Sequence, residues 1–254
     1  MDLPFDIVDH IFGFLRTHPT SLLACSKAHP DLSPIATRHF YYHTIVHTGL
    51  IGFTHSLEPT CLLNRIFETP RIGNHVRVLQ IECNHDLLWP FEDISLLLPK
   101  LPVLECLMLS AKHKYLSWQK LPHSFRSAVE DSLHLPTLHE VHVGDLAFPL
   151  SILESTNISL LSISGVPKIS EYPNIIYPQL KSLSTKGIDS DPDQLFIIWA
   201  RQCIGNLQSL ECAYSDDEPS VLNELLKVCS ETLETLDISL SLTCSCELSS
   251  ILGT

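Results

Sequence analysis

The chain has 254 residues, of which 44% are hydrophobic and 18% are charged, so it can bury a sizeable core and lacks the composition of a disordered protein. Its 29 Asp and Glu residues outnumber its 16 Lys and Arg residues, and the resulting formal net charge of −13 argues against a nucleic-acid partner. The most hydrophobic stretch, residues 94–111, is interrupted by Pro99, Lys100, Pro102 and Glu105, so no membrane-spanning segment is expected.

The cysteines and the first residues predict an intracellular protein of the cytoplasm or nucleus. Nine cysteines, an odd number at irregular spacing, are typical of buried thiols rather than of a disulfide framework. The first ten residues contain Asp2, Asp6 and Asp9 and no positive charge, which is not the pattern of a secretory signal.

The first predicted element is a helix with an unusually broad apolar arc, which covers about half of its circumference. The residues on this arc are Phe5, Ile7, Val8, Ile11, Phe12, Phe14 and Leu15. Two further short helices are expected over residues 20–26 and 34–41, separated by a breaker at residues 28–31. A domain of about forty residues has a core too small to make it stable by itself. The excess apolar surface therefore predicts docking, either on the rest of the chain or on a second protein.

Residues 3–46 resemble an F-box-like motif, especially the divergent version found in many fungal proteins. The matching positions are Leu3, Pro4, Ile7, Ile11 and Leu15, then Ser21, Leu22, Cys25 and Ser26, then Ala36, Arg38, His39 and Phe40. The sequence departs from that family where the aromatic residue that usually follows the second helix is replaced by Ala28-His29-Pro30.

The resemblance implies two partners and a division of labour along the chain. An F-box docks on the Skp-type adaptor of a cullin-based ubiquitin ligase, and through it on a cullin, while a following repeat domain binds the protein substrate. The docking residues that the resemblance implies are Leu3, Pro4, Ile7, Ile11, Leu15 and Leu22.

An apolar signature, L-x-x-L-x-L with substitutions, recurs seven times after residue 75, at steps of 20 to 34 residues. The copies are Val76/Leu79/Ile81, Leu104/Leu107/Leu109, Leu138/Val141/Val143, Ile158/Leu161/Ile163, Leu180/Leu183/Thr185, Leu207/Leu210/Cys212 and Leu233/Leu236/Ile238. The steps straddle the leucine-rich-repeat period of about 20–29 residues. Helical patterns lie between the copies, at residues 92–98, 124–133, 193–203 and 219–229.

The expected fold class is therefore α/β: an irregular leucine-rich-repeat solenoid, or horseshoe, after a small three-helix F-box-like module. The module covers residues 1–40, a linker and first irregular repeat cover 41–75, and the solenoid covers 76–254. The alternative is an ordinary α/β domain whose strands happen to read L-x-L.

Strand residues that lie between the signature positions point to the opposite face, where a solenoid binds its partners. The predicted substrate-binding residues are Val78, Gln80, Met108, Glu140, His142 and Glu211. The alternative is that these are merely solvated strand faces, since hydroxyl residues suit exposed strands.

No motif predicts chemistry, so we expect no enzyme, no metal and no cofactor. The closest metal-ligand spacings are Cys83-x-His85, His139-x-x-His142 and Cys244-x-Cys246, and none forms a paired motif. Asp189, Asp191 and Asp193 are expected to cap a helix rather than to hold calcium.

The expected function is substrate recognition in a Skp–cullin–F-box ubiquitin ligase. The alternatives are a leucine-rich-repeat interaction scaffold with no ubiquitin role, and a hydrolase with an unrecognised site.

Overall fold

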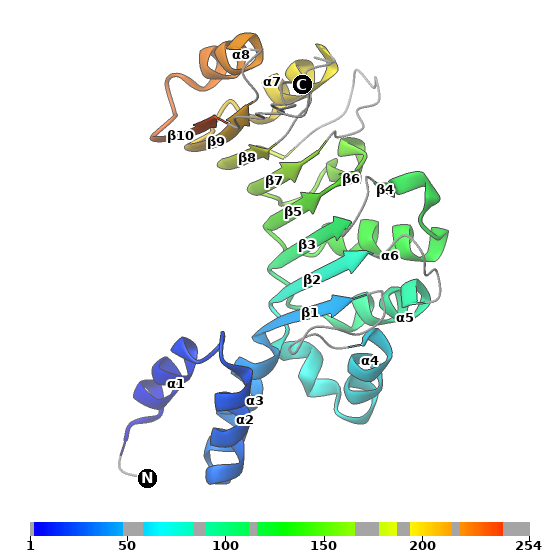
Figure 1. Cartoon of the computed structure of the whole chain (residues 1–254), viewed down its shortest axis with the longest axis vertical. Coiled ribbons are helices and arrows are strands. Elements are labelled where there is room, and N and C mark those ends of the chain that lie inside the picture. The colour runs from blue at the N-terminus through cyan, green and yellow to red at the C-terminus, as the bar shows by residue number, and fades with distance from the viewer. Residues whose placement is uncertain are drawn as a thin grey trace, which may run out of the picture.

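The computed structural model describes residues 3–47, 58–83, 90–111, 116–165, 178–186, 194–214 and 219–240 (Figure 1). Several residues singled out in the sequence lie outside these ranges. They are His85, Asp189, Asp191, Asp193, Cys244 and Cys246.

Three helices open the chain, as the sequence predicts: α1 (Phe5–Phe14), α2 (Pro19–Ala28) and α3 (Leu32–Tyr42). Pro19 occupies the first turn of α2, where its missing N–H costs no helical hydrogen bond. The extended backbone of His29 ends α2 within the expected breaker. A small separate core of Val8, Phe12, Leu22, Ile35 and Ala36 holds the three helices together.

Among the described residues, eight parallel strands form one sheet, and their order in the sheet follows their order in the chain. They are β1 (His43–His47), β2 (Val78–Cys83), β3 (Cys106–Ala111), β5 (Glu140–Gly144), β7 (Leu160–Ser164), β8 (Ser182–Lys186), β9 (Ser209–Tyr214) and β10 (Thr235–Leu240). Two short strands, β4 (Leu116–Ser117) and β6 (Leu146–Ala147), pair separately. The protein is thus a mixed α/β structure built on a parallel sheet.

The strand register confirms the alignment of the seven signature copies. The central position of each copy pairs with that of the next, from Leu79 to Leu107, through Val141, and on to Leu236. Strand β1 precedes the first copy and lies in residues 41–75, where the sequence predicts a linker and first irregular repeat but sets no bounds for a strand, because residues 43–47 do not carry the signature.

Parallel strands need crossover connections, and helices supply most of them. They are α4 (Pro59–Glu68), α5 (Pro90–Leu97), α6 (His123–Leu133), α7 (Gln194–Cys203) and α8 (Pro219–Cys229), with short 3₁₀ helices at Pro70–His75, Leu98–Lys100, Trp118–Lys120 and Leu150–Leu153. Helices α5 to α8 confirm the four helical patterns, whereas α4 lies in the predicted linker and first irregular repeat, where the sequence set no bounds for a helix. Figure 1 shows α4, α5 and α6 on the same side of β1, β2 and β3.

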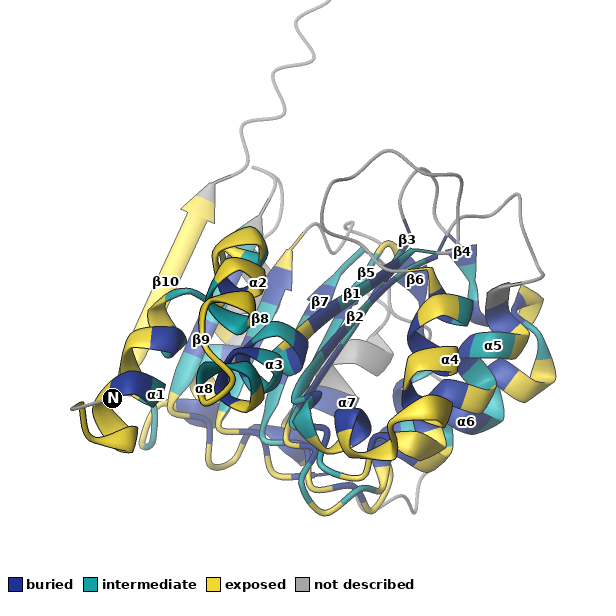
Figure 2. Ribbon diagram, turned by 90° about the horizontal axis from the view of Figure 1, so that it is seen from below, coloured by how far each residue is buried: buried dark blue, intermediate teal, exposed yellow. Residues whose placement is uncertain are grey.

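The main core lies between the sheet and these helices. Signature residues such as Leu79, Leu107 and Val141 are fully buried, while the alternate residues of the same strands are mostly half-buried. The last copy departs from this rule, because Leu236 and Ile238 are each 44% exposed. Strand β10 is the last described strand of the sheet and has a strand partner on one side only, and Figure 2 shows it as exposed. The signature positions of this last copy are therefore not buried within the described part of the chain.

Candidate docking surface and open face of the sheet

Helix α1 divides its apolar residues between the core and the surface. Val8 and Phe12 are buried against α2 and α3, whereas Ile7, Ile11 and Phe14 lie on the exposed side. We use the name docking surface for the exposed apolar residues of the three-helix module: Leu3, Phe5, Ile7, Ile11, Phe14 and Leu23. Their side chains are 46–71% exposed, which is unusual for so many large apolar residues in about twenty positions.

The structure brings together four of the six docking residues implied by the sequence. Leu3, Pro4, Ile7 and Ile11 are exposed on or directly before α1. Leu15 follows α1 and packs against the module core, so only part of its side chain is accessible.

Leu22 corrects the prediction. It is fully buried in the core of the module, because α2 turns it towards Val8 and Phe12. The adjacent Leu23 is 48% exposed and lies on the surface instead. Phe5 and Phe14 belong to the broad apolar arc that the sequence predicts. The sequence does not indicate which half of that arc is covered by α2 and α3.

An apolar pocket of about 470 Å³ adjoins the docking surface at Phe5. The pocket is lined mainly by α3 and the 3₁₀ helix Pro70–His75, with Pro34, Ile35 and Ile72 among its residues. Phe5, at the start of α1, is thus both an exposed residue of the docking surface and part of the lining of this pocket.

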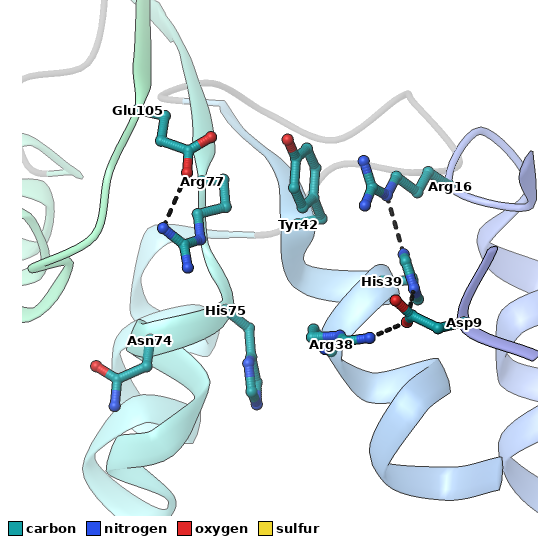
Figure 3. A pocket seen from close by; sticks show the side chains of 9 residues that line it. All are labelled: Asp9, Arg16, Arg38, His39, Tyr42, Asn74, His75, Arg77 and Glu105. Atoms are coloured by element: carbon teal, nitrogen blue, oxygen red, sulfur yellow. Dashed lines mark hydrogen bonds and ion pairs between the residues drawn. The ribbon is translucent and has the colours of Figure 1, made fainter. Parts of the chain in front are cut away.

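A polar network fixes α1 against α3 (Figure 3). His39 is 3% exposed; its Nε2 lies 2.6 Å from Oδ1 of Asp9, and its Nδ1 accepts a hydrogen bond of 2.9 Å from Nε of Arg16. Arg38 forms an ion pair with the same Asp9 carboxylate. Burial, then Arg16, then Arg38 lower the pKa of His39 to about 4, so its imidazole is neutral at pH 7 and donates from Nε2.

This network lines a cavity of about 280 Å³ between the helical module and the start of the sheet. Its arginines already have partners. The Arg16 guanidinium lies 3.6 Å from the ring centre of Tyr42, and Nη1 of Arg77 lies 2.9 Å from Oε1 of Glu105. The residues that line this cavity come from both the helical module and the start of the sheet, and its arginines interact with other side chains.

The second candidate surface is the side of the sheet formed by the alternate strand residues, which we call the open face. All six predicted substrate-binding residues lie on it: Val78, Gln80, Met108, Glu140, His142 and Glu211. Gln80 pairs in register with Met108, and Met108 with His142. Their half-burial leaves each of these side chains partly accessible. The placement is as predicted, while binding stays a prediction.

Polar side-chain contacts on the open face connect residues that the sequence pattern did not associate. His47 and Glu82, register partners on β1 and β2, approach to 2.6 Å. On β9, Glu211 accepts hydrogen bonds of 2.8 Å from Lys186 and Ser184, and these bonds hold its pKa below the ordinary value. Strand register, rather than local spacing, creates these pairs.

Three potential metal ligands also meet on the open face. The donor atoms of Cys106, Glu140 and His142 all lie within 4.8 Å of one another. Cys106 is 3% exposed although its position in the strand faces the open side of the sheet. The sequence search missed the group because it considered only closely spaced residues.

No helix in the described part of the chain is both long and apolar enough to cross a bilayer. No protein-family model, curated protein or solved structure matches the chain.

Proposed function

We propose that the protein is the substrate-recognition subunit of a Skp–cullin–F-box ubiquitin ligase. Its helical module docks on a Skp-type adaptor, and through it on a cullin, while the sheet domain binds a protein substrate. The protein performs no bond chemistry in this role; it positions a substrate near the ubiquitin-loaded enzyme. Such a role belongs to the cytoplasm or nucleus.

The observation that carries the proposal is the exposed apolar side of α1. The helix already packs on the module core through Val8 and Phe12. The exposed side chains of Ile7, Ile11 and Phe14 make no part of that core. Burying one such side chain completely contributes about 1.5–3 kcal/mol. A partner that covers several of these half-exposed side chains is stabilised by the burial of each one. Several exposed apolar residues on one helix therefore suit docking through that helix.

The resemblance of residues 3–46 to an F-box supplies the class of partner. Leu3, Pro4, Ile7 and Ile11 match that motif, and all four side chains are accessible. The occupant of the docking surface is therefore a Skp-type adaptor rather than a second copy of this chain.

We further propose that the sheet and its crossover helices form an irregular leucine-rich-repeat solenoid. Support comes from the parallel strands in chain order and from the stacked signature residues, of which Leu107, Val141 and Leu161 are fully buried. Each repeat then buries its apolar side against its neighbours, and the open face is left for the substrate.

Co-expression of the full chain with a fungal Skp-type adaptor tests the docking. The wild type is expected to co-purify with the adaptor as a stoichiometric complex. Ile7→Asp and Ile11→Asp should abolish co-purification, because each places a carboxylate in an apolar contact. Both positions are 46% exposed, so the variants should remain folded.

Phe67→Asp is the matched control, since Phe67 is 59% exposed on α4 and lies outside the docking surface. Adaptor binding should persist in this variant. If the wild type fails to bind the adaptor, or if Ile7→Asp and Ile11→Asp bind it as well as Phe67→Asp does, the ligase role is refuted. The protein is then better described as an interaction scaffold with no ubiquitin role.

A further inference from the structure

The group formed by Cys106, Glu140 and His142 joins two neighbouring strands of the sheet. Cys106 and Glu140 are register partners at the starts of β3 and β5, and His142 lies two residues further along β5 on the same face. Nε2 of His142 and Oε1 of Glu140 are 2.6 Å apart. All three donor atoms lie within 4.8 Å of one another, so a small displacement brings them around one ion.

We propose that Cys106, Glu140 and His142 form a Zn²⁺ site on the open face, with three protein ligands and a fourth position for water or for a donor from a bound partner. A thiolate sulfur, an imidazole nitrogen and a carboxylate oxygen are the ligand types that Zn²⁺ takes in proteins. Such a mixed set favours Zn²⁺ over Mg²⁺ and Ca²⁺, which prefer oxygen ligands alone.

The charges of the group fit a divalent cation. One thiolate and one carboxylate carry two negative charges and the imidazole is neutral, so a bound Zn²⁺ makes the site neutral overall. This balance matters because Cys106 is buried and a net charge beside it would be poorly solvated.

A cysteine without metal is a thiol at neutral pH, so Cys106 must lose a proton when it binds the ion. Coordination breaks the S–H bond, forms the S–Zn bond and releases the proton to solvent. The imidazole of His142 binds through a ring nitrogen lone pair.

The position of the group gives the fourth ligand access from outside. The side chains of Glu140 and His142 are 29% and 32% exposed, whereas Cys106 forms the buried end of the site. Met108, the register partner of His142, lies beside the group on the open face. The zinc site does not depend on adaptor docking, since it lies on the sheet and not on the helical module.

A cobalt titration of the full-length protein, stripped of metal with a chelator, tests the site. Co²⁺ bound to a thiolate gives a near-ultraviolet charge-transfer band, and tetrahedral coordination gives intense visible bands. We expect one Co²⁺ per chain with both features, and displacement by Zn²⁺. Cys106→Ser should remove the charge-transfer band, and Glu140→Gln and His142→Ala should each weaken binding by about tenfold or more.

The other cysteines provide controls. Cys61→Ser removes an exposed thiol on α4 and should leave the titration unchanged. A Cys244→Ser/Cys246→Ser variant tests the closely spaced cysteine pair and should also keep the site. At one Zn²⁺ concentration, the ion should raise the thermal unfolding temperature of the wild type and of these controls by more than that of His142→Ala.

The proposal is overturned if the wild type binds no Co²⁺ through a thiolate, or if the band survives in Cys106→Ser. It is equally overturned if the band disappears in Cys244→Ser/Cys246→Ser. Should Cys106→Ser fail to fold, His142→Ala decides the question, because His142 is partly exposed and undiminished binding in that variant excludes the site.

Discussion

His39 and Asp9 are separated by thirty residues, yet Nε2 of His39 lies 2.6 Å from Oδ1 of Asp9. The contact joins α3 to the middle of α1. Arg16 donates to the other ring nitrogen of His39, so the arrangement requires a neutral imidazole. A neutral imidazole thus links α1, Arg16 and α3 within the helical module.

The stability of the protein should fall as the pH drops from about 6.5 towards 4. The folded-state pKa of His39 is about 4, against an ordinary value of 6.5, so between these values the unfolded chain binds a proton that the folded chain does not. The stabilisation is fully present above pH 6.5 and is lost through this window. Urea unfolding at pH 7.5 and pH 5 measures it.

His39→Gln is the comparison for this pH dependence. The variant should lose part of the difference between the two pH values, while His43 and His75, whose pKa values are also lowered, preserve the rest. An identical pH dependence in the variant and the wild type would show that His39 does not carry this linkage.

Leu107→Ala should lower the free energy of unfolding by about 2–5 kcal/mol. The side chain of Leu107 is fully buried in the main core, so its truncation leaves a cavity there. Leu96→Ala makes the same change at a position on α5 that is 56% exposed, and should cost about 0.5 kcal/mol or less. Denaturant unfolding compares the two variants. Equal effects would mean that the strand register is misassigned.

Leu22 and Leu23 are neighbours in sequence with opposite roles. Leu22→Ala should destabilise the helical module by about 2–5 kcal/mol, since Leu22 has no exposed surface. Leu23→Ala should leave stability nearly unchanged and weaken adaptor binding, because Leu23 is 48% exposed on the docking surface. Thermal unfolding and an adaptor titration separate the two effects. A stable Leu22→Ala variant would contradict the assignment of Leu22 to the core.

Gly73→Ala should destabilise the protein by about 1–3 kcal/mol. An added Cβ would lie 2.2 Å from the backbone carbonyl oxygen of Lys100, so the chain would have to shift. Gly13→Ala is the control, because no atom outside the local helix lies within 4 Å of its added Cβ. That change should stabilise α1 by about 0.5–1 kcal/mol. Thermal unfolding that shows the same sign for both variants would refute the close approach at Gly73.

The open face should control substrate capture separately from adaptor docking. A Met108→Ala/Glu211→Lys variant changes two residues of this face and leaves the three proposed zinc ligands intact. Proximity labelling in cells should lose substrate candidates with this variant but retain the adaptor, whereas Ile7→Asp should lose the adaptor. If every labelled protein persists in the double variant, the open face does not bind the substrate.

The sequence by itself determined the periodic parts of this fold. Alternation within each strand places Leu79, Leu107 and Val141 on one face, and parallel register aligns them once the copies are stacked. Apolar spacing of three and four residues located α6 and α8 to within one residue. These features depend on neighbours along the chain, which a sequence pattern records directly. The sequence set no bounds for strand β1, because residues 43–47 do not repeat the signature.

Only the tertiary structure decided which apolar and polar groups are accessible and which meet. The broad arc of α1 is visible in the sequence, but the packing of α2 and α3 buries Val8 and leaves Ile7 exposed. The group of Cys106, Glu140 and His142 likewise forms because parallel register places β3 beside β5. Local patterns specify the face of an element on which a side chain lies, whereas long-range contacts depend on how separate elements pack. The candidate sites of this protein arise from those long-range contacts.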